Sequence, residues 1–219
     1  MTERSALQRR LEEGIAELGL TLPADAVSRL LDYQALLARW NATYNLTAVR
    51  DPAEMVTRHL LDSLAILPYV TGATLADLGT GPGLPGIVLA IAAPGRAITL
   101  VDSNGKKVRF LREAIRALKL EGVQAVQSRV EDVQGSFDCI TARAFASFAD
   151  MLAWGGHLLA PGGRWLAMKG RRPDDELAGL PPGFALTALH ALAVPGLEGE
   201  RHLAVIEHAP APAPGAAAC

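Results

Sequence analysis

The segment 75–86, which reads LADLGTGPGLPG, constrains the fold of this chain more than any other part of the sequence. An apolar run ends at Asp77, a glycine-rich turn follows, and an apolar helix begins at Pro85. Glycines let the backbone turn sharply and approach a ligand closely. The start of a helix adds unpaired N–H groups and a partial positive charge. This order of elements predicts the strand, loop and helix start of a nucleotide-type binding site.

The glycine spacing fits two classes of adenosine cofactor. The glycines of 81–86 match the dinucleotide fingerprint, with Asp102 about twenty residues further on, at the end of the next apolar run. The segment 77–83, Asp-x-Gly-x-Gly-x-Gly, also matches the first motif of S-adenosylmethionine (SAM) methyltransferases. A tight turn without a ligand is the third interpretation. It is disfavoured because four glycines and two prolines between buried elements pack poorly on their own.

Short apolar runs alternate with helical patterns from Thr74 onward, which predicts an α/β fold with a mostly parallel, doubly wound sheet. The last two runs are joined by 195–199, which is too short for a crossover helix, so they form an antiparallel hairpin. A seven-stranded Rossmann-like sheet that ends in such a hairpin is typical of class I SAM methyltransferases. The predicted strands are 75–78, 97–101, 123–127, 137–141, 164–168, 185–192 and 203–206, and the helices between them are 84–93, 106–120 and 146–159.

Helical patterns precede the sheet and divide the chain into three parts. Residues 1–70 are expected to form a helical extension packed on the core, residues 71–208 the SAM-binding domain, and residues 209–219 a disordered alanine–proline tail. One helix ends at Gly19, a second opens at Pro23, and a third starts with Asp51 as its N-cap. In the third helix Arg58 and Asp62 are four residues apart, a spacing that fits a surface ion pair.

Composition indicates the cellular compartment of the protein and the kinds of partner that it can bind. The net charge of −2 gives no global basic field, although a local basic face for nucleic acid remains possible. Cys139 and Cys219 have neither disulfide nor metal spacing, which indicates a reducing compartment. We find no signal peptide, membrane-spanning run or metal motif. We therefore expect a cytoplasmic monomer that binds neither a membrane nor a metal ion.

The residues that follow the strands favour SAM over a dinucleotide. An acidic residue after the third strand, Glu131 or Asp132, could lie near an adenine amino group, although a solvated loop explains either residue equally well. No histidine or lysine stands out as the acid or base of a hydride transfer. The fourth strand is followed by 141–145, which lacks the Asn/Asp-Pro-Pro-aromatic motif of enzymes that methylate exocyclic amino groups. Cys139 lies inside this strand and is a poor candidate for the thiolate that carbon methylation needs.

These absences leave an acceptor that needs little chemical help, such as N7 of guanine. Its lone pair is available and its methylation releases no proton, so alignment of the reacting atoms supplies most of the rate. We assign no certain catalytic residue. Basic side chains near the strand ends are the candidates for contact with RNA, while the more distant Arg116 and Lys119 fit a solvated helix face. The RNA candidates are Arg58, His59, Lys106 and Lys169.

An ordered set of motifs from Trp40 to Ile206 resembles the RsmG (GidB) family of bacterial 16S ribosomal RNA methyltransferases. The matching segments are WNATYNLTAVRD at 40–51, RHLLDS at 58–63, DLGTGPGLPG at 77–86, DSNGK at 102–106, VRFL at 108–111, QSRVE at 127–131, RAFAS at 143–147, KG at 169–170, DE at 175–176 and ERHL at 200–203. Asn104, Lys107 and the tail depart from the family pattern. The departures affect fine RNA contacts and not the reaction.

The resemblance implies SAM as the cofactor and, as the substrate, N7 of a guanine in the 530 loop (helix 18) of 16S rRNA, in the small ribosomal subunit or its assembly intermediate. Matching by motif, Gly79 and Leu84 contact SAM, Val130 and Glu131 hold its adenine end, and Arg143 occupies the position after the fourth strand. We add Gly81 in the glycine loop and Asp102 on the ribose. The alternatives are a small-molecule methyltransferase, a ribosome factor that binds SAM or RNA without catalysis, and an NAD-dependent oxidoreductase.

Overall fold

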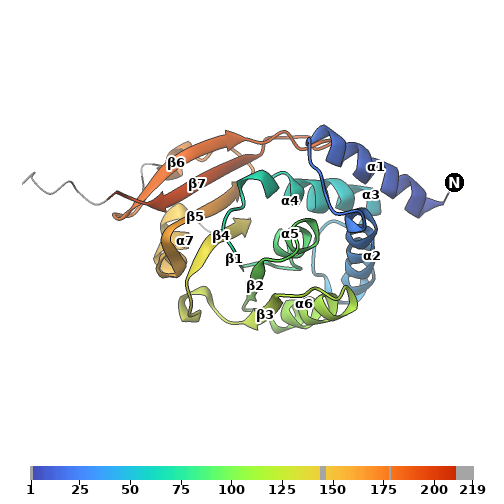
Figure 1. Cartoon of the computed structure of the whole chain (residues 1–219), viewed down its shortest axis with the longest axis horizontal. Helices are drawn as coiled ribbons and strands as arrows, with labels where there is room; N and C mark the ends of the chain where they lie inside the picture. Colours follow the sequence, from blue (N-terminus) through green and yellow to red (C-terminus); the bar gives the residue numbers. More distant parts are fainter. Residues whose placement is uncertain (1, 144–146, 178, 211–219) are drawn as a thin grey trace, which may run out of the picture.

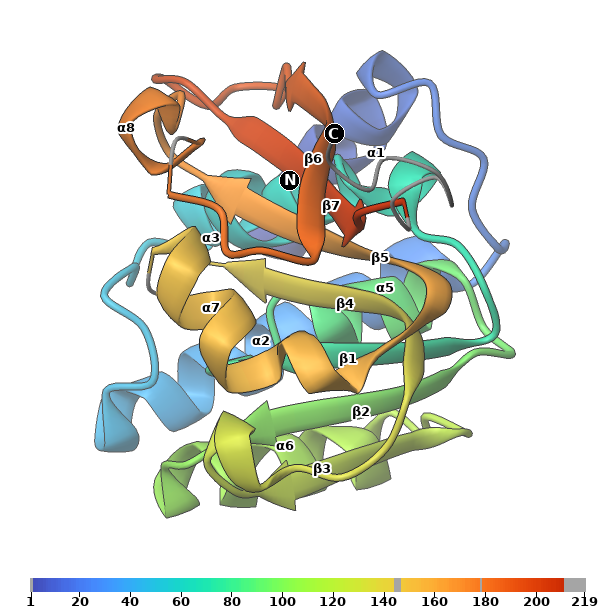
Figure 2. The ribbon, with the colours of Figure 1, turned by 90° about the vertical axis from the view of Figure 1, so that its left-hand side faces the viewer.

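The computed structural model describes residues 2–143, 147–177 and 179–210. The predicted tail therefore lies outside the described residues, apart from Ala209 and Pro210. Seven strands form one sheet in the order β3-β2-β1-β4-β5-β7-β6, in which β7 alone runs antiparallel to its two neighbours (Figure 2). The predicted fold class, a mostly parallel Rossmann-like sheet with a terminal antiparallel hairpin, is confirmed.

The strands occupy the predicted places, and their ends differ by one or two residues except in β5. β5 begins at residue 159 and not at 164, because Leu159 already pairs with Phe137 before an irregularity in the ladder. Pro161 and the glycine pair 162–163 follow Ala160, and the pattern of apolar residues therefore did not reveal this first part. The strands are β1 Thr74–Leu78, β2 Ala97–Asp102, β3 Val123–Gln127, β4 Phe137–Arg143, β5 Leu159–Lys169, β6 Phe184–Ala191 and β7 His202–His208.

The helices also follow the prediction, except in the third helix of the extension. Asp51 caps it as predicted, since its Oδ1 accepts the Glu54 N–H at 2.8 Å. The helix then continues as a π-helical segment, η1 (Val56–Leu61), where we expected regular α-helix. Short α8 was not predicted because four residues are too few to show a helical period. The α-helices are α1 Glu3–Glu17, α2 Ala26–Tyr44, α3 Pro52–Met55, α4 Asp62–Leu64, α5 Gly86–Ala92, α6 Gly105–Ala117, α7 Phe148–Gly155 and α8 Asp174–Leu177.

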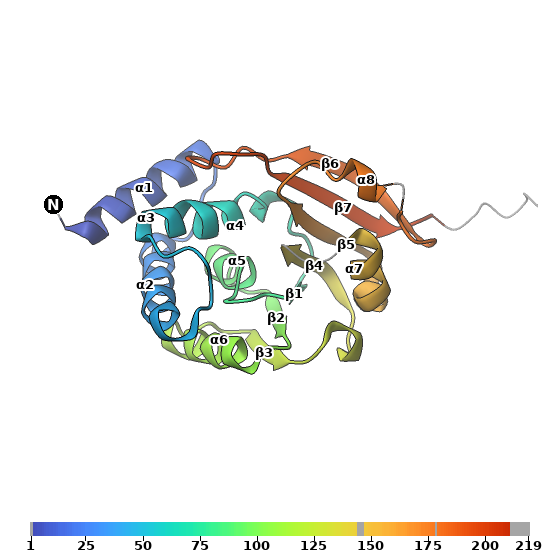
Figure 3. The same cartoon turned by 180° about the vertical axis from the view of Figure 1, so that it is seen from behind.

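The two faces of the sheet are covered unequally. Leu75, Cys139 and Leu166 belong to the same core cluster as the buried residues of α1, α2, α4, α5 and α6 and point to this helical side of the sheet. Their neighbours Ala76 and Ile140 point to the other face, which α7 covers. This alternation is the period of two expected of a strand that is buried on both sides. Figures 1 and 3 show the crowded helical layer on one side of the sheet and α7 on the other.

The N-terminal helices share the hydrophobic core of the sheet and reach the glycine loop. Trp40 of α2 packs edge-on against Phe110 of α6, with ring centroids 5.7 Å apart. Buried Tyr33 of α2 donates its hydroxyl to the Pro82 carbonyl at 2.8 Å. The extension thus holds the backbone of the loop from one side. Within the described residues, no helix is both long and apolar enough to cross a membrane.

Replacing Tyr33 by Phe should lower the free energy of unfolding by about 1–3 kcal/mol, because the buried Pro82 carbonyl loses its partner. Urea unfolding measures the change. Tyr44→Phe is the matched control, since the Tyr44 hydroxyl makes no hydrogen bond among the described residues. Equal stability of the two variants would show that the bond to the loop contributes nothing.

Candidate functional site

The glycine loop is organised around Asp77 at the carboxyl end of β1. The Asp77 side chain is fully buried. Its Oδ2 accepts the Gly86 N–H at 2.8 Å and the Thr80 hydroxyl, and its Oδ1 accepts the Thr141 hydroxyl of β4 at 3.0 Å. Burial raises the pKa of Asp77 to about 6, although these donors act in the opposite direction. Asp77 therefore fixes the loop and the start of α5 from within the protein.

Asp102 ties the same loop to the end of β2. Its Oδ2 accepts the Gly81 N–H at 3.0 Å, and its Oδ1 accepts the Asn104 N–H at 2.8 Å. Lys107 Nζ lies 3.6 Å from Oδ2. Gly81 has a φ of +61°, and no atom lies within 4 Å of where a Cβ would stand. The loop thus leaves open space that a side chain would enter.

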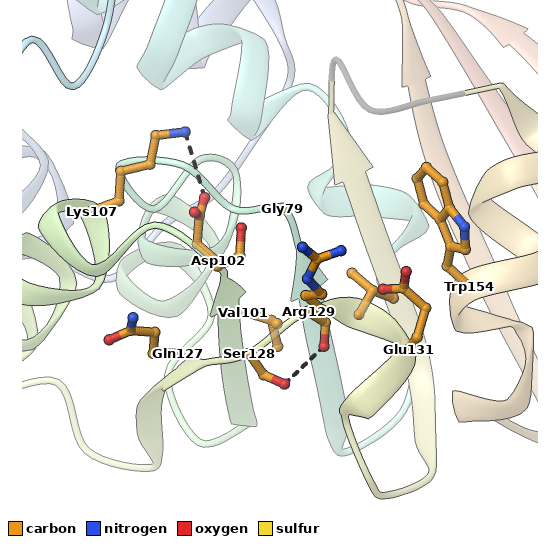
Figure 4. A pocket seen from close by; sticks show the side chains of 11 residues that line it. Gly79, Val101, Asp102, Lys107, Gln127, Ser128, Arg129, Glu131 and Trp154 are labelled. Carbon is orange, nitrogen blue, oxygen red and sulfur yellow. Dashed lines mark hydrogen bonds and ion pairs between the residues drawn. The ribbon is translucent and has the colours of Figure 1, made fainter.

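A cavity of about 910 Å³ opens beside Gly79 and Asp102. Figure 4 shows Asp102 and Lys107 on one side of it, and Glu131 and Trp154 on the other. Its complete lining is Gly79, Val101, Asp102, Ser103, Lys107, Gln127, Ser128, Arg129, Val130, Glu131 and Trp154. Apolar side chains mixed with a few carboxylates and amides suit a flat heterocycle joined to a hydroxylated sugar. Four predicted cofactor residues, Gly79, Asp102, Val130 and Glu131, therefore meet here.

A second cavity of about 420 Å³ shares Gly79 and Lys107 with the first. The other three predicted cofactor residues, Gly81, Leu84 and Arg143, line it together with Lys169. Arg201, which precedes β7, and Asp62 also line it. Four cationic side chains and one carboxylate thus line this cavity, whereas the first has two carboxylates, Asp102 and Glu131, and two cations, Lys107 and Arg129. The two linings fit different chemical groups.

The predicted surface pair between Arg58 and Asp62 is not formed. Asp62 is 1% exposed, and its carboxylate binds Arg143 Nη1 at 3.2 Å and Arg201 Nε at 2.8 Å. Arg58 is exposed and offers its backbone carbonyl to Arg143. The spacing rule failed because it assumes an α-helix, whereas residues 56–61 form a π-helical turn.

The predicted RNA residues have different surroundings. Lys169 lines the second cavity and is bound by Glu176, with an Nζ–Oε2 distance of 2.7 Å. Lys106 is exposed and, like Arg58, lines neither of the two cavities. His59 is 5% exposed, and its Nε2 lies 2.9 Å from the Thr47 hydroxyl. Contact of these residues with RNA stays a prediction.

Sequence reasoning missed several lining residues. Trp154 reaches the first cavity from α7, and Asp62, Lys107 and Arg201 reach the second from separate segments. Asp62 and Arg201 lie in matching motifs, at 58–63 and 200–203, and these motifs were the signal that could have found them. Among the described residues, no group of three or more His, Cys, Asp or Glu side chains could hold a metal ion.

Acid should destabilise the folded protein through His59. Burial, and next the charge of Arg143, lower the pKa of His59 to about 4 from 6.5. Between pH 6.5 and about 4, His59 binds a proton in the unfolded chain but not in the folded protein. The free energy of unfolding is therefore highest above pH 6.5 and decreases as the pH falls through this range. His59→Gln should reduce this loss by about 3 kcal/mol.

Urea unfolding at a series of pH values from 7 to 4 measures the effect. His190→Gln removes a partly exposed imidazole and serves as the control. An unchanged pH dependence in His59→Gln would contradict the assignment of a neutral, buried ring.

The whole chain is similar to proteins of known name. A protein of Xanthomonas euvesicatoria named ribosomal RNA small subunit methyltransferase G is 56% identical over 92% of this chain and 93% of its own length. A protein of the same name from Stenotrophomonas maltophilia is 58% identical over 90% of this chain and 92% of its own. The solved magnesium protoporphyrin IX methyltransferase of Synechocystis, 12% identical, superposes with a TM-score of 0.58 over 81% of this chain and 98% of its own, which shows a shared fold.

The family model described as rRNA small subunit methyltransferase G matches residues 26–204. This range contains every residue predicted for the site and both cavities. With that match and relatives more than half identical along most of their length, the chain belongs to the GidB family.

Proposed function

We propose that this protein transfers a methyl group from SAM to N7 of one guanine in the 530 loop (helix 18) of bacterial 16S rRNA. The supporting observation is a pair of cavities that share Gly79 and Lys107, one suited to adenosine and one lined by four cations, in a chain that is 56% identical to a ribosomal RNA small subunit methyltransferase G. The substrate is the small ribosomal subunit or its assembly intermediate, and the enzyme acts in the cytoplasm as a monomer.

The first cavity has the size and donor set for the adenosine part of SAM. Its volume is within the range of small-molecule sites. Val130 and Glu131 would hold the adenine, and Asp102 would accept a ribose hydroxyl with the lone pairs that its backbone donors leave free. Gly79 and Gly81 leave room beside the loop for the rest of the cofactor. Leu84 and Arg143, at the second cavity, would contact it near the acceptor.

The lining of the second cavity agrees with N7 as the acceptor. Asp62 is the one carboxylate among the described residues that line it, and both its oxygens already bind arginines. Neither histidine nor cysteine is among the described residues of this lining. The described lining therefore offers no carboxylate, imidazole or thiol that is free to act as a general base. Methylation of N7 requires none, because that nitrogen carries no proton. Lys107, Arg143, Lys169 and Arg201 would hold the RNA backbone.

Methyl transfer would depend on alignment of the SAM methyl group with N7 of the guanine. Bound SAM supplies a methyl group on a positively charged sulfur. The glycine loop, fixed by Asp77, Asp102 and Tyr33, would hold the cofactor still while the cationic cavity holds the RNA, and positioning of this kind can replace acid–base catalysis. We further propose that residues 1–70 act as an extension of the catalytic domain 71–208. Arg58, His59 and Lys106 would then belong to the outer part of the RNA-binding face.

Small subunits from cells that lack N7 methylation in the 530 loop test the reaction. Incubation with the protein and methyl-labelled SAM should label one guanine, which N7-specific cleavage of the RNA then locates. Subunits already methylated at this position are the control and should take up no label. Absence of label, with SAM binding intact by calorimetry, would contradict the proposed acceptor and retain the cofactor.

Gly81→Ala should weaken SAM binding by about tenfold, because the added methyl group strains a backbone with φ of +61° and enters the space beside the loop. Calorimetry measures the dissociation constant. Gly95→Ala is matched to it, since Gly95 also has a positive φ and open space around it but lies outside both cavities. If the two variants bind SAM equally well, Gly81 is no part of the cofactor site.

A further inference from the structure

The buried carboxylate of Asp62 joins three separate parts of the chain. Asp62 follows the π-helical turn η1 in the extension, Arg143 ends β4, and Arg201 precedes β7. The carboxylate binds Arg143 through Oδ2 and Arg201 through Oδ1, and all three side chains line the second cavity. We propose that Asp62 is a positioning residue for the RNA: it orients Arg201 so that the guanidinium binds a backbone phosphate beside the target guanine. This inference rests on the proposed function.

The two arginines depend on Asp62 to different degrees. Arg143 Nη1 has a second anchor, the Arg58 carbonyl at 3.1 Å, in a distant part of the chain. Arg201 has as its other bond the carbonyl of its own neighbour Glu200, which moves with the same loop. The bond from Nε to Asp62 is therefore what fixes the Arg201 guanidinium relative to the glycine loop and to Arg143. Loss of this bond should affect Arg201 more than Arg143.

Orientation matters because a guanidinium is a flat fork of five N–H donors. Asp62 holds Arg201 by Nε, and Nη1 bonds to Glu200, so Nη2 donates to no residue that the structure describes. The Arg201 side chain is 26% exposed and lines the second cavity, so an anion in that cavity can approach it. Phosphate oxygens accept such a fixed fork with better geometry than they accept a freely rotating ammonium group.

The distribution of charge in the second cavity also favours Arg201 as a phosphate-binding residue. Lys107 pairs with Asp102, and Lys169 pairs with Glu176, so each lysine has its own carboxylate. Arg143 and Arg201 share the single carboxylate of Asp62. The excess positive charge of the cavity wall is therefore concentrated on the two arginines. Asp62 also reduces the repulsion between the two guanidinium groups, which share one wall.

Asp62→Asn tests the proposal because it keeps the shape of the side chain and removes its charge. We expect KM for unmethylated small subunits to rise about tenfold, kcat to change less than about threefold, and the dependence of KM on salt to become shallower. The dissociation constant for SAM should change less than about threefold, since Arg143 keeps its bond to the Arg58 carbonyl. Asp138→Asn is the control: its carboxylate bonds to Ala73 and Thr74 at the opposite end of β1, away from the cavity.

A double-mutant cycle separates positioning from simple stabilisation. If Asp62 acts through Arg201, the variant with both Asp62→Asn and Arg201→Gln should have the same KM as Arg201→Gln alone. Additive effects on KM, or a loss of SAM affinity equal to the loss of RNA affinity, would overturn the proposal. So would an unchanged KM in Asp62→Asn at a temperature where the variant is folded.

Arg201→Lys decides the question if Asp62→Asn does not fold. Lysine keeps the charge on a partly exposed side chain but lacks the oriented fork, so KM should rise as in Arg201→Gln. A wild-type KM would overturn the proposal. If the wild-type protein transfers no methyl group, the proposed function fails. Filter binding of the same variants to small subunits then decides the role of Asp62 on affinity alone.

Discussion

The site depends on one buried carboxylate, that of Asp77. A charged group without access to water is tolerated only when hydrogen bonds compensate for its lost hydration. Asp77 obtains them from Thr80, from the first N–H of α5 and from Thr141 of β4. The compensation is partial, as the raised pKa of Asp77 shows. Satisfying Asp77 therefore forces the loop, the helix start and the neighbouring strand into one arrangement, on which both cavities are built.

The two cavities differ in the charge of their linings. A net charge of −2 gives no indication of a basic surface, yet four cations surround the smaller cavity. The carboxylates that offset them lie directly beside them, so the protein keeps the cations close together without a large overall charge. Local arrangement, and not total charge, decides which anionic group such a surface can bind.

The fold and the glycine loop could be predicted because their signals are local. The period of apolar residues, the turn glycines and the Asp51 cap are each read within a few residues of sequence. Asp62 shows the limit of this approach: its partners Arg143 and Arg201 lie far away in the chain, and η1 removes the spacing that pointed to Arg58. Trp154 and Lys107 were missed for the same reason, since only the folded sheet brings α7 and α6 to one cavity. The family resemblance located the motifs at 58–63, 143–147 and 200–203, but it did not show that Asp62, Arg143 and Arg201 contact one another.

The unequal covering of the sheet has a consequence for synthesis of the chain. Helices α1, α2 and α4 leave the ribosome before any strand exists, and the core that they later share with β1 and α5 is incomplete at that stage. Folding of domains during synthesis is paced by elongation at about 5–20 residues per second. The N-terminal helices therefore spend seconds as exposed amphipathic segments, in need of shelter from aggregation. A protein whose family modifies the ribosome therefore first meets a ribosome as an incompletely folded nascent chain.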